Sequence, residues 1–169
     1  MILNTVDDAP RKVLLLLFGL CLAALGFGLY LQHVVGLNPC PMCIVQRYAL
    51  LLVGLVAGLT AVASRRNALR FGVVLWGLLA TGGAFVAARQ SFLQWYPPEV
   101  TTCGRDFYGM IETFPLQRAI PMIFKGSGDC AAVDWTFLGG TLANWSFVVF
   151  SSITLLSLLL LVRSRHWIR

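Results

Sequence analysis

Hydrophobic residues along the chain gather into four long runs, separated by short polar segments and by one long polar segment. The runs cover approximately 13–31, 44–63, 71–88 and 145–162, and each is as long as the roughly 17 to 25 helical residues that cross a bilayer core. Pro, Asp, Glu and Lys do not occur inside them, and Arg47 is their only basic residue. The pattern predicts an all-α membrane protein, a bundle of four transmembrane helices.

The composition supports this prediction, because 58% of the 169 residues are hydrophobic and only 12% are charged, which is far from the profile of a soluble domain. The sequence contains no internal repeat, interdomain linker or low-complexity segment, so we expect one membrane domain over residues 1–169. The first run exceeds the roughly 7 to 15 residues of a signal-peptide core and lacks an A-x-A cleavage site, so it is predicted to be a permanent helix.

Most of the basic residues lie on one side of the predicted bundle. Eight of the 13 are in the N-terminal tail, the link between the second and third runs, and the C-terminal tail, namely Arg11, Lys12, Arg65, Arg66, Arg70, Arg163, Arg165 and Arg169. Such segments stay in the cytoplasm. In a bacterial inner membrane both termini would therefore be cytoplasmic, and the loops 32–43 and 89–144 would be periplasmic. The net charge of +6 reflects this topology, and we expect no nucleic-acid partner.

Four of the five cysteines fall in the two outer loops. Cys40 and Cys43 lie in the first loop, and Cys103 and Cys130 lie in the second. The periplasm is an oxidising compartment in which disulfides persist. Cys21 lies near the middle of the first helix, where a small apolar packing role is expected.

The stretch NPCPMCIVQRY, residues 38–48, places a C-x-x-C motif at the start of the second helix. Pro41 suits the first helical position, with Cys40 as the cap and Cys43 at the third position. A thiolate on Cys43 would lie among unpaired N–H groups at the positive end of the helix dipole. Arg47, one turn further on the same face, could stabilise that thiolate or bind a carbonyl oxygen of a ligand. The simpler interpretation is an arginine that extends to the lipid headgroups; beside the C-x-x-C we favour the functional one.

Metal and haem sites do not fit this cysteine pattern. Ile44 follows the motif, which excludes a C-x-x-C-H haem attachment. Cys103 and Cys130 are 27 positions apart, whereas a zinc ribbon requires a second closely spaced pair. The two histidines, His33 and His166, are predicted on opposite sides of the membrane. We therefore expect no metal, and interpret His33 as an interfacial residue with a minor role left open.

The second cysteine pair allows two interpretations. A disulfide between Cys103 and Cys130 would close a loop of about 28 residues and stabilise it by roughly 3 to 4 kcal/mol. Glycines flank both cysteines, at Gly104, Gly126 and Gly128, and an exposed backbone of this kind suits a disulfide that exchanges with another thiol.

Small residues predict where the helices pack closely. Gly54 and Gly58 form a G-x-x-x-G pattern in the second helix, and Gly82 and Gly83 lie together in the third. Such positions allow two helix backbones to approach each other.

These features together resemble the DsbB-type disulfide bond formation proteins, over nearly the whole chain. The resemblance rests on four helices, on CPMC followed by Arg47, and on YPPEVTTC and KGSGDC in the second outer loop. It implies a membrane thiol oxidase that reoxidises the periplasmic thioredoxin-fold oxidant DsbA and passes the electrons to the membrane quinone pool.

The resemblance also assigns roles. Cys103 would be attacked by reduced DsbA, with Cys130 as its disulfide partner. The electrons would then move to Cys40 and Cys43, all four cysteines being catalytic. Cys43 would contact the quinone, and Arg47 would support it electrostatically.

Gln90 departs from the family pattern, because well-known members carry a quinone-holding histidine there. Gln can donate a hydrogen bond to a quinone carbonyl but cannot become cationic, so Gln90 is kept as a cofactor-binding candidate. Arg89 beside it is expected to anchor the end of the third helix. Ubiquinone and menaquinone both remain open as the cofactor.

Other functions fit the sequence less well than thiol oxidation. The main alternative is a non-enzymatic four-helix scaffold in the lipid membrane, with two structural disulfides. A transporter of reducing power would need paired cysteines within the membrane, whereas Cys21 stands alone. A quinone-linked reductase of the vitamin K epoxide type fits the loop pattern less well.

Overall fold

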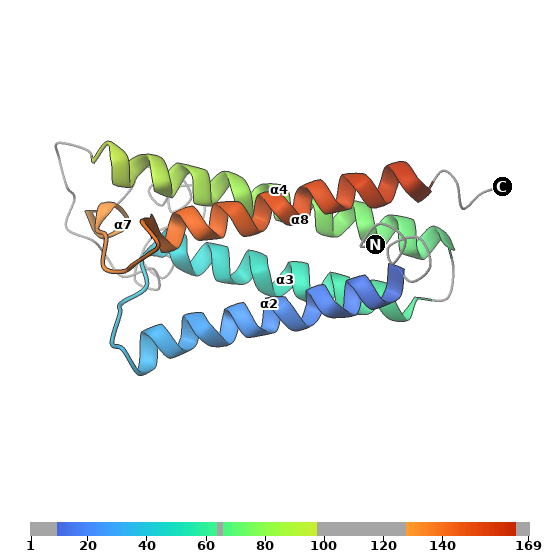
Figure 1. Cartoon of the computed structure of the whole chain (residues 1–169), viewed down its shortest axis with the longest axis horizontal. Coiled ribbons are helices and arrows are strands. Elements are labelled where there is room, and N and C mark those ends of the chain that lie inside the picture. Colours follow the sequence, from blue (N-terminus) through green and yellow to red (C-terminus); the bar gives the residue numbers. More distant parts are fainter. Residues whose placement is uncertain (1–9, 64–65, 98–127, 165–169) are drawn as a thin grey trace, which may run out of the picture.

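The computed structural model describes residues 10–63, 66–97 and 128–164, and four long helices dominate them (Figure 1). The elements are α2 (Pro10–His33), α3 (Pro41–Val62), α4 (Arg66–Trp95), α7 (Gly128–Ala131), β1 (Thr136–Phe137), β2 (Gly140–Thr141) and α8 (Leu142–Ser164). α2, α3, α4 and α8 are each long and apolar enough to cross a membrane. The predicted four-helix membrane bundle is confirmed.

The long helices run alternately up and down, with α4 packed between α3 and α8, and α2 packed on α3. Figure 1 shows that α2 begins and α8 ends at one end of the bundle, while α7 lies at the opposite end. We call the α7 end the cysteine end, because Cys40, Cys43 and Cys130 all lie there, and we call the opposite end the basic end.

Apolar side chains cover both the inside and the outside of the bundle. Trp76 and Leu14 are buried at its centre, while many Leu, Val and Phe side chains remain exposed on the helix surfaces. Lipid tails can solvate such a surface, and the helices satisfy their own backbone hydrogen bonds. The outer face of this bundle is therefore suited to lipid and not to water.

The G-x-x-x-G pattern of α3 lies at a close helix contact, as predicted. A Cβ built on Gly54 would lie 3.0 Å from Cys21 Cβ, and one on Gly58 would lie 3.3 Å from a ring carbon of Phe18. Cys21 is only 3% exposed, which confirms it as a packing residue between α2 and α3.

α4 carries glycines at its contacts with both neighbours. A Cβ on Gly72 would meet Thr60 of α3 at 2.0 Å, and one on Gly83 would meet Phe150 of α8 at 2.5 Å. Gly82 has open space beside it. Of the two glycines predicted to serve packing in this helix, only Gly83 does so.

The helices at the cysteine end are longer than the apolar runs. α4 continues to Trp95, beyond the boundary at 88 that hydropathy predicts, so Arg89 and Gln90 are helical and do not belong to the following loop. Leu93 and Gln90 are buried there against other elements. The helix thus extends beyond its apolar run, and residues in the extension pack against other elements.

Candidate active site

The C-x-x-C motif starts α3 in the predicted way. Cys40 is the N-cap residue, with an extended backbone, and Pro41 occupies the first turn. The Cys43 backbone N–H donates to Cys40 Sγ over 3.2 Å, and the Ile44 N–H donates to the Cys40 carbonyl over 3.1 Å. The cap therefore holds both sulfurs at the helix N-terminus, among backbone N–H groups that have no carbonyl partner within the helix.

Cys130 joins this pair from α7. Its side chain is fully buried, in a cluster with Cys40, Met42, Val86 and Leu93. The pKa of the Cys40 thiol is raised, first by its hydrogen bond with Cys130, then by that with Cys43, and further by burial. Two cysteines that are 90 positions apart are thus in direct contact. Cys103 lies outside the described residues, so its pairing with Cys130 stays a prediction.

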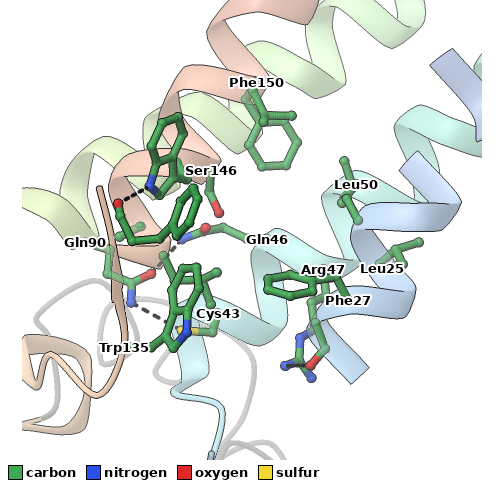
Figure 2. A pocket seen from close by; sticks show the side chains of 17 residues that line it. Leu25, Phe27, Cys43, Gln46, Arg47, Leu50, Gln90, Trp135, Ser146 and Phe150 are labelled. Atoms are coloured by element: carbon green, nitrogen blue, oxygen red, sulfur yellow. Dashed lines mark hydrogen bonds between the residues drawn. The ribbon is translucent and has the colours of Figure 1, made fainter. Parts of the chain in front are cut away.

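Gln90 links the cysteines to a second glutamine. Its side-chain nitrogen donates to Cys40 Sγ and to Cys43 Sγ, each over 3.2 Å. Its oxygen accepts from Gln46 Nε2 over 2.7 Å. Both glutamines are buried, at 4% and 6% exposure for Gln90 and Gln46. Figure 2 shows these dashed contacts running from Gln46 through Gln90 to the sulfur of Cys43.

Sequence reasoning missed Gln46, although a signal for it was present. Gln46 follows Cys43 by three positions, so it lies near Cys43 on the surface of α3, and it is a polar residue within a span predicted as apolar. A polar residue inside a membrane helix usually has a partner or a function.

Arg47 connects α3 to α2. Its guanidinium donates to Gln32 Oε1 and, over 2.9 Å, to the Gly28 carbonyl. The hydrogen bonds that the structure describes for Arg47 thus go to α2 and not to Cys43. Its positive charge still lies at the wall of the cavity described next.

A cavity of about 580 Å³ lies beside the sulfur of Cys43 (Figure 2). α2, α3, α8 and the segment around the β-hairpin form most of its wall, and Gln90 is the residue that α4 contributes. The lining residues are Ala24, Leu25, Phe27, Gly28, Cys43, Gln46, Arg47, Leu50, Gln90, Trp135, Phe137, Leu142, Ala143, Trp145, Ser146, Val149 and Phe150. Most are apolar, and the polar ones include Cys43 and its neighbours on α3.

Aromatic rings from the hairpin segment close one side of the cavity. Trp135 stacks on Phe137 with ring centroids 6.0 Å apart and meets Phe27 of α2 edge-on at 5.8 Å. Trp145 Nε1 donates to the Phe137 carbonyl over 3.0 Å. These contacts join α2, the hairpin and α8 around the space next to Cys43.

The hairpin itself is held against α4. Thr141 donates from its hydroxyl to Gln94 Oε1 over 2.7 Å and accepts from the Asn144 N–H over 3.3 Å, so it also caps α8. Leu138 and Gly139 form the turn, both with positive φ, at 49° and 79°. Such angles are typical of the two-residue turn that matches strand twist.

The remaining candidates lie away from the cavity. His33 is exposed at the last position of α2 and lines neither the cavity nor the small space next to Cys40. Arg89 lies over the Phe92 ring at 5.6 Å. Within residues 10–63, 66–97 and 128–164, no group of His, Cys, Asp or Glu is arranged to hold a metal ion.

Comparison with known proteins identifies the family. The sequence profile of the family "Disulfide bond formation protein DsbB" matches residues 10–160. A protein named "Disulfide bond formation protein B" from Polaromonas naphthalenivorans (strain CJ2) is 71% identical over 163 residues, which cover 96% of this chain and 97% of that protein. A protein of the same name from Azoarcus sp. (strain BH72) is 51% identical over 159 residues, covering 92% and 94%. With a match of this extent, and with the cysteines of its motif at the end of a four-helix membrane bundle, the chain belongs to the DsbB family of disulfide bond formation proteins.

Proposed function

We propose that this protein is a thiol oxidase of the bacterial inner membrane, which reoxidises a DsbA-like periplasmic partner and passes the electrons to a membrane quinone. One observation carries the proposal: the Cys40–Cys43 pair touches buried Cys130 on one side and an apolar cavity on the other. Such a pair can receive electrons from a loop cysteine and deliver them into the membrane. Membership of the DsbB family supports the same role in disulfide formation.

The cavity fits a quinone by shape and chemistry. A quinone has a flat ring with two carbonyl acceptors and an apolar tail, and pockets of roughly 300 to 1,000 Å³ hold ligands of this size. The wall here is mostly apolar and aromatic, with Arg47, Gln46 and Gln90 as the hydrogen-bonding residues near Cys43. α2 and α8 both line the cavity, and both carry apolar side chains on their outer faces.

Disulfide exchange follows from which sulfurs are in contact. A thiolate on Cys130 attacks the Cys40 sulfur of a Cys40–Cys43 disulfide, which forms a Cys40–Cys130 bond and releases Cys43 as a thiolate at the cavity wall. A Cys103 thiolate then attacks Cys130, which restores the Cys103–Cys130 disulfide and releases Cys40. That restored disulfide can oxidise the next partner dithiol.

The last step returns Cys40 and Cys43 to a disulfide. When bound, a quinone supplies the electron acceptor, taking up the two electrons and two protons that leave the Cys40–Cys43 dithiol. Cys43 would be the cysteine that reacts with a quinone, because it lines the cavity, whereas Cys40 faces Cys130. Arg47, which is bound to α2 by its hydrogen bonds, contributes a permanent positive charge to the cavity wall and would donate hydrogen bonds to a quinone carbonyl.

The proposed orientation places the cysteine end in the periplasm. Arg11 and Arg70 lie near the starts of α2 and α4, at the basic end, and Arg11 donates to the Ala63 carbonyl at the end of α3. Positive charge at this end favours the cytoplasm, so the exchange cysteines would face the oxidising compartment.

The test is quinone reduction by the purified protein in detergent, followed by absorbance after adding reduced DsbA. We expect reduction of ubiquinone or menaquinone that needs both DsbA and Cys43, so that Cys43→Ser is inactive. If a folded, oxidised sample reduces neither quinone and its cysteines stay oxidised beside reduced DsbA, the membrane scaffold is the better interpretation.

A further inference from the structure

The Gln90 amide uses both its nitrogen and its oxygen in hydrogen bonds. The nitrogen lies 3.2 Å from each of two sulfurs, Cys40 Sγ and Cys43 Sγ, and the oxygen accepts from Gln46. A primary amide offers two N–H donors and one carbonyl acceptor. Both ends are therefore engaged in an interior where an unpaired polar group is costly.

The orientation of the Gln90 amide decides whether its nitrogen or its oxygen faces the two sulfurs. A glutamine side chain can rotate to exchange its oxygen and nitrogen. If Gln90 did so here, its carbonyl oxygen would face the sulfurs, and its N–H groups would oppose the N–H of Gln46. With Gln46 as the donor, as in this structure, its bond holds the nitrogen of Gln90 towards Cys40 and Cys43.

We propose that Gln46 is a positioning residue: acting through Gln90, it keeps a hydrogen-bond donor between the two sulfurs of the C-x-x-C motif. We call Gln46 and Gln90 together the amide relay. The donors stabilise negative charge on either sulfur, since hydrogen bonds to ionised groups are the stronger ones. Its role in turnover rests on the proposed thiol oxidase, but the geometry concerns the sulfurs alone.

A donor shared by both sulfurs suits disulfide exchange. When the Cys40–Cys43 bond is attacked at Cys40, the negative charge leaves on Cys43, and in the return reaction charge resides on Cys40 before the bond reforms. The Gln90 nitrogen is equally distant from both sulfurs. The same donor group can therefore serve each step without rearranging.

The amide relay contains no group that titrates. The charged or titratable residues that the structure describes around it are Cys40, Cys43, Cys130, Arg47 and Asp134. Arg47 donates to α2, and Asp134 is exposed at the rim of the small space next to the cysteines. The donor towards the sulfurs should therefore persist across the physiological pH range.

Two substitutions of similar size separate positioning from packing. Gln46→Met removes the donor to Gln90. Gln46→Glu, when ionised, also presents only acceptors, so it draws the Gln90 nitrogen towards itself and turns the Gln90 oxygen to the sulfurs. When protonated, the carboxylic acid regains a donor.

The readout is the rate at which iodoacetamide alkylates Cys43 in the reduced full-length protein in detergent, quantified by mass spectrometry of the Cys43 peptide. At about pH 8 we expect wild type to react fastest, Gln46→Met about 10-fold more slowly, and Gln46→Glu more slowly still, because a charge-assisted hydrogen bond is lost and then replaced by repulsion. Towards about pH 5 the rate of Gln46→Glu relative to Gln46→Met should rise as the carboxyl protonates.

Equal rates for the two variants at every pH would overturn the proposal and leave Gln46 as a packing residue, as would wild-type rates in both. Thermal unfolding of each variant identifies any loss of folding. Comparing the alkylation rates of the two variants at the same pH removes the dependence on pH that both variants share. Because alkylation needs neither quinone nor DsbA, this result is independent of the quinone assay. A failed quinone assay with the expected alkylation order would refute the oxidase and leave the amide relay standing.

Discussion

The two halves of the bundle differ in their side-chain hydrogen bonds, although the basic end also has one between elements, from Arg11 to the Ala63 carbonyl. Towards the basic end, hydroxyls bond to carbonyls of their own helix, as Thr60 does to Val56 and Ser157 to Thr154. At the cysteine end, polar side chains bond between elements, from α3 to α4 through Gln46 and Gln90, from α3 to α2 through Arg47, and from the hairpin to α4 through Gln94.

The closeness of helix packing also differs between the two halves. Around Gly72, towards the basic end, the helices approach so closely that a Cβ would overlap a neighbour, whereas beside Cys43 they enclose a cavity of about 580 Å³. Close packing stabilises helices in lipid, where the hydrophobic effect between them is absent. The helices at the cysteine end are not packed as closely beside Cys43. Side-chain hydrogen bonds between the elements hold this end together around a space that a ligand can enter.

The largest expected effect tests whether chemistry belongs to the cysteine end alone. Cys43→Ser should abolish quinone reduction, because its sulfur faces the cavity and a serine hydroxyl cannot form a disulfide. Cys21→Ala, in the packed half, should keep wild-type turnover. Turnover by Cys43→Ser, or its loss in Cys21→Ala with the fold intact, would remove the functional contrast between the two halves.

The next effect concerns stability at the packed contacts. Gly72→Ala should lower the free energy of unfolding by about 1 to 3 kcal/mol, a typical cost of overpacking, because its Cβ would meet the Thr60 side chain. Gly82→Ala on the same helix has open space and should be neutral or slightly stabilising. Denaturant unfolding in detergent micelles compares the two, and equal stabilities would show that this contact relaxes without cost.

A substitution at Arg47 tests the hydrogen bonds between elements at the cysteine end. Arg47→Ala should raise the quinone KM about 10-fold, about 1.4 kcal/mol, with a smaller change in unfolding, because it removes both the charge at the cavity and the link to α2. Arg89→Ala is the matched control, since Arg89 lies over Phe92 outside the cavity. Quinone kinetics that are unchanged by Arg47→Ala would make Arg47 an interfacial anchor.

The smallest effect concerns the hairpin turn. Leu138 has a positive φ of 49° and is 81% exposed, so it bears backbone strain with little packing to offset it. Leu138→Asn would create the Asn-Gly pair that this turn favours and should stabilise the protein by about 0.5 to 1 kcal/mol. Thermal unfolding measures the gain; a loss would indicate that the leucine side chain makes a contact that matters more than its strain.

Hydropathy predicted the four helices, and the position of Pro41 in the C-x-x-C motif predicted the N-terminus of α3. Both predictions were possible because these signals are local in the sequence. Hydropathy predicts only the membrane-spanning part of α4, to 88, whereas the helix continues to Trp95, and Gln90 in this extension bonds to a residue far away in sequence. Gln46 was missed for a related reason: its importance lies in a bond to a residue 44 positions away.

Four membrane-spanning helices, and the cysteine pair that begins one of them, can be read from the sequence, because hydrophobic length and helix capping depend on neighbouring residues. The contact of Cys130 with Cys40, the Gln90 amide that faces both sulfurs and the cavity beside Cys43 become visible only in the folded bundle. These features depend on how separate helices pack against one another, and the hydropathy pattern along the chain does not specify that arrangement.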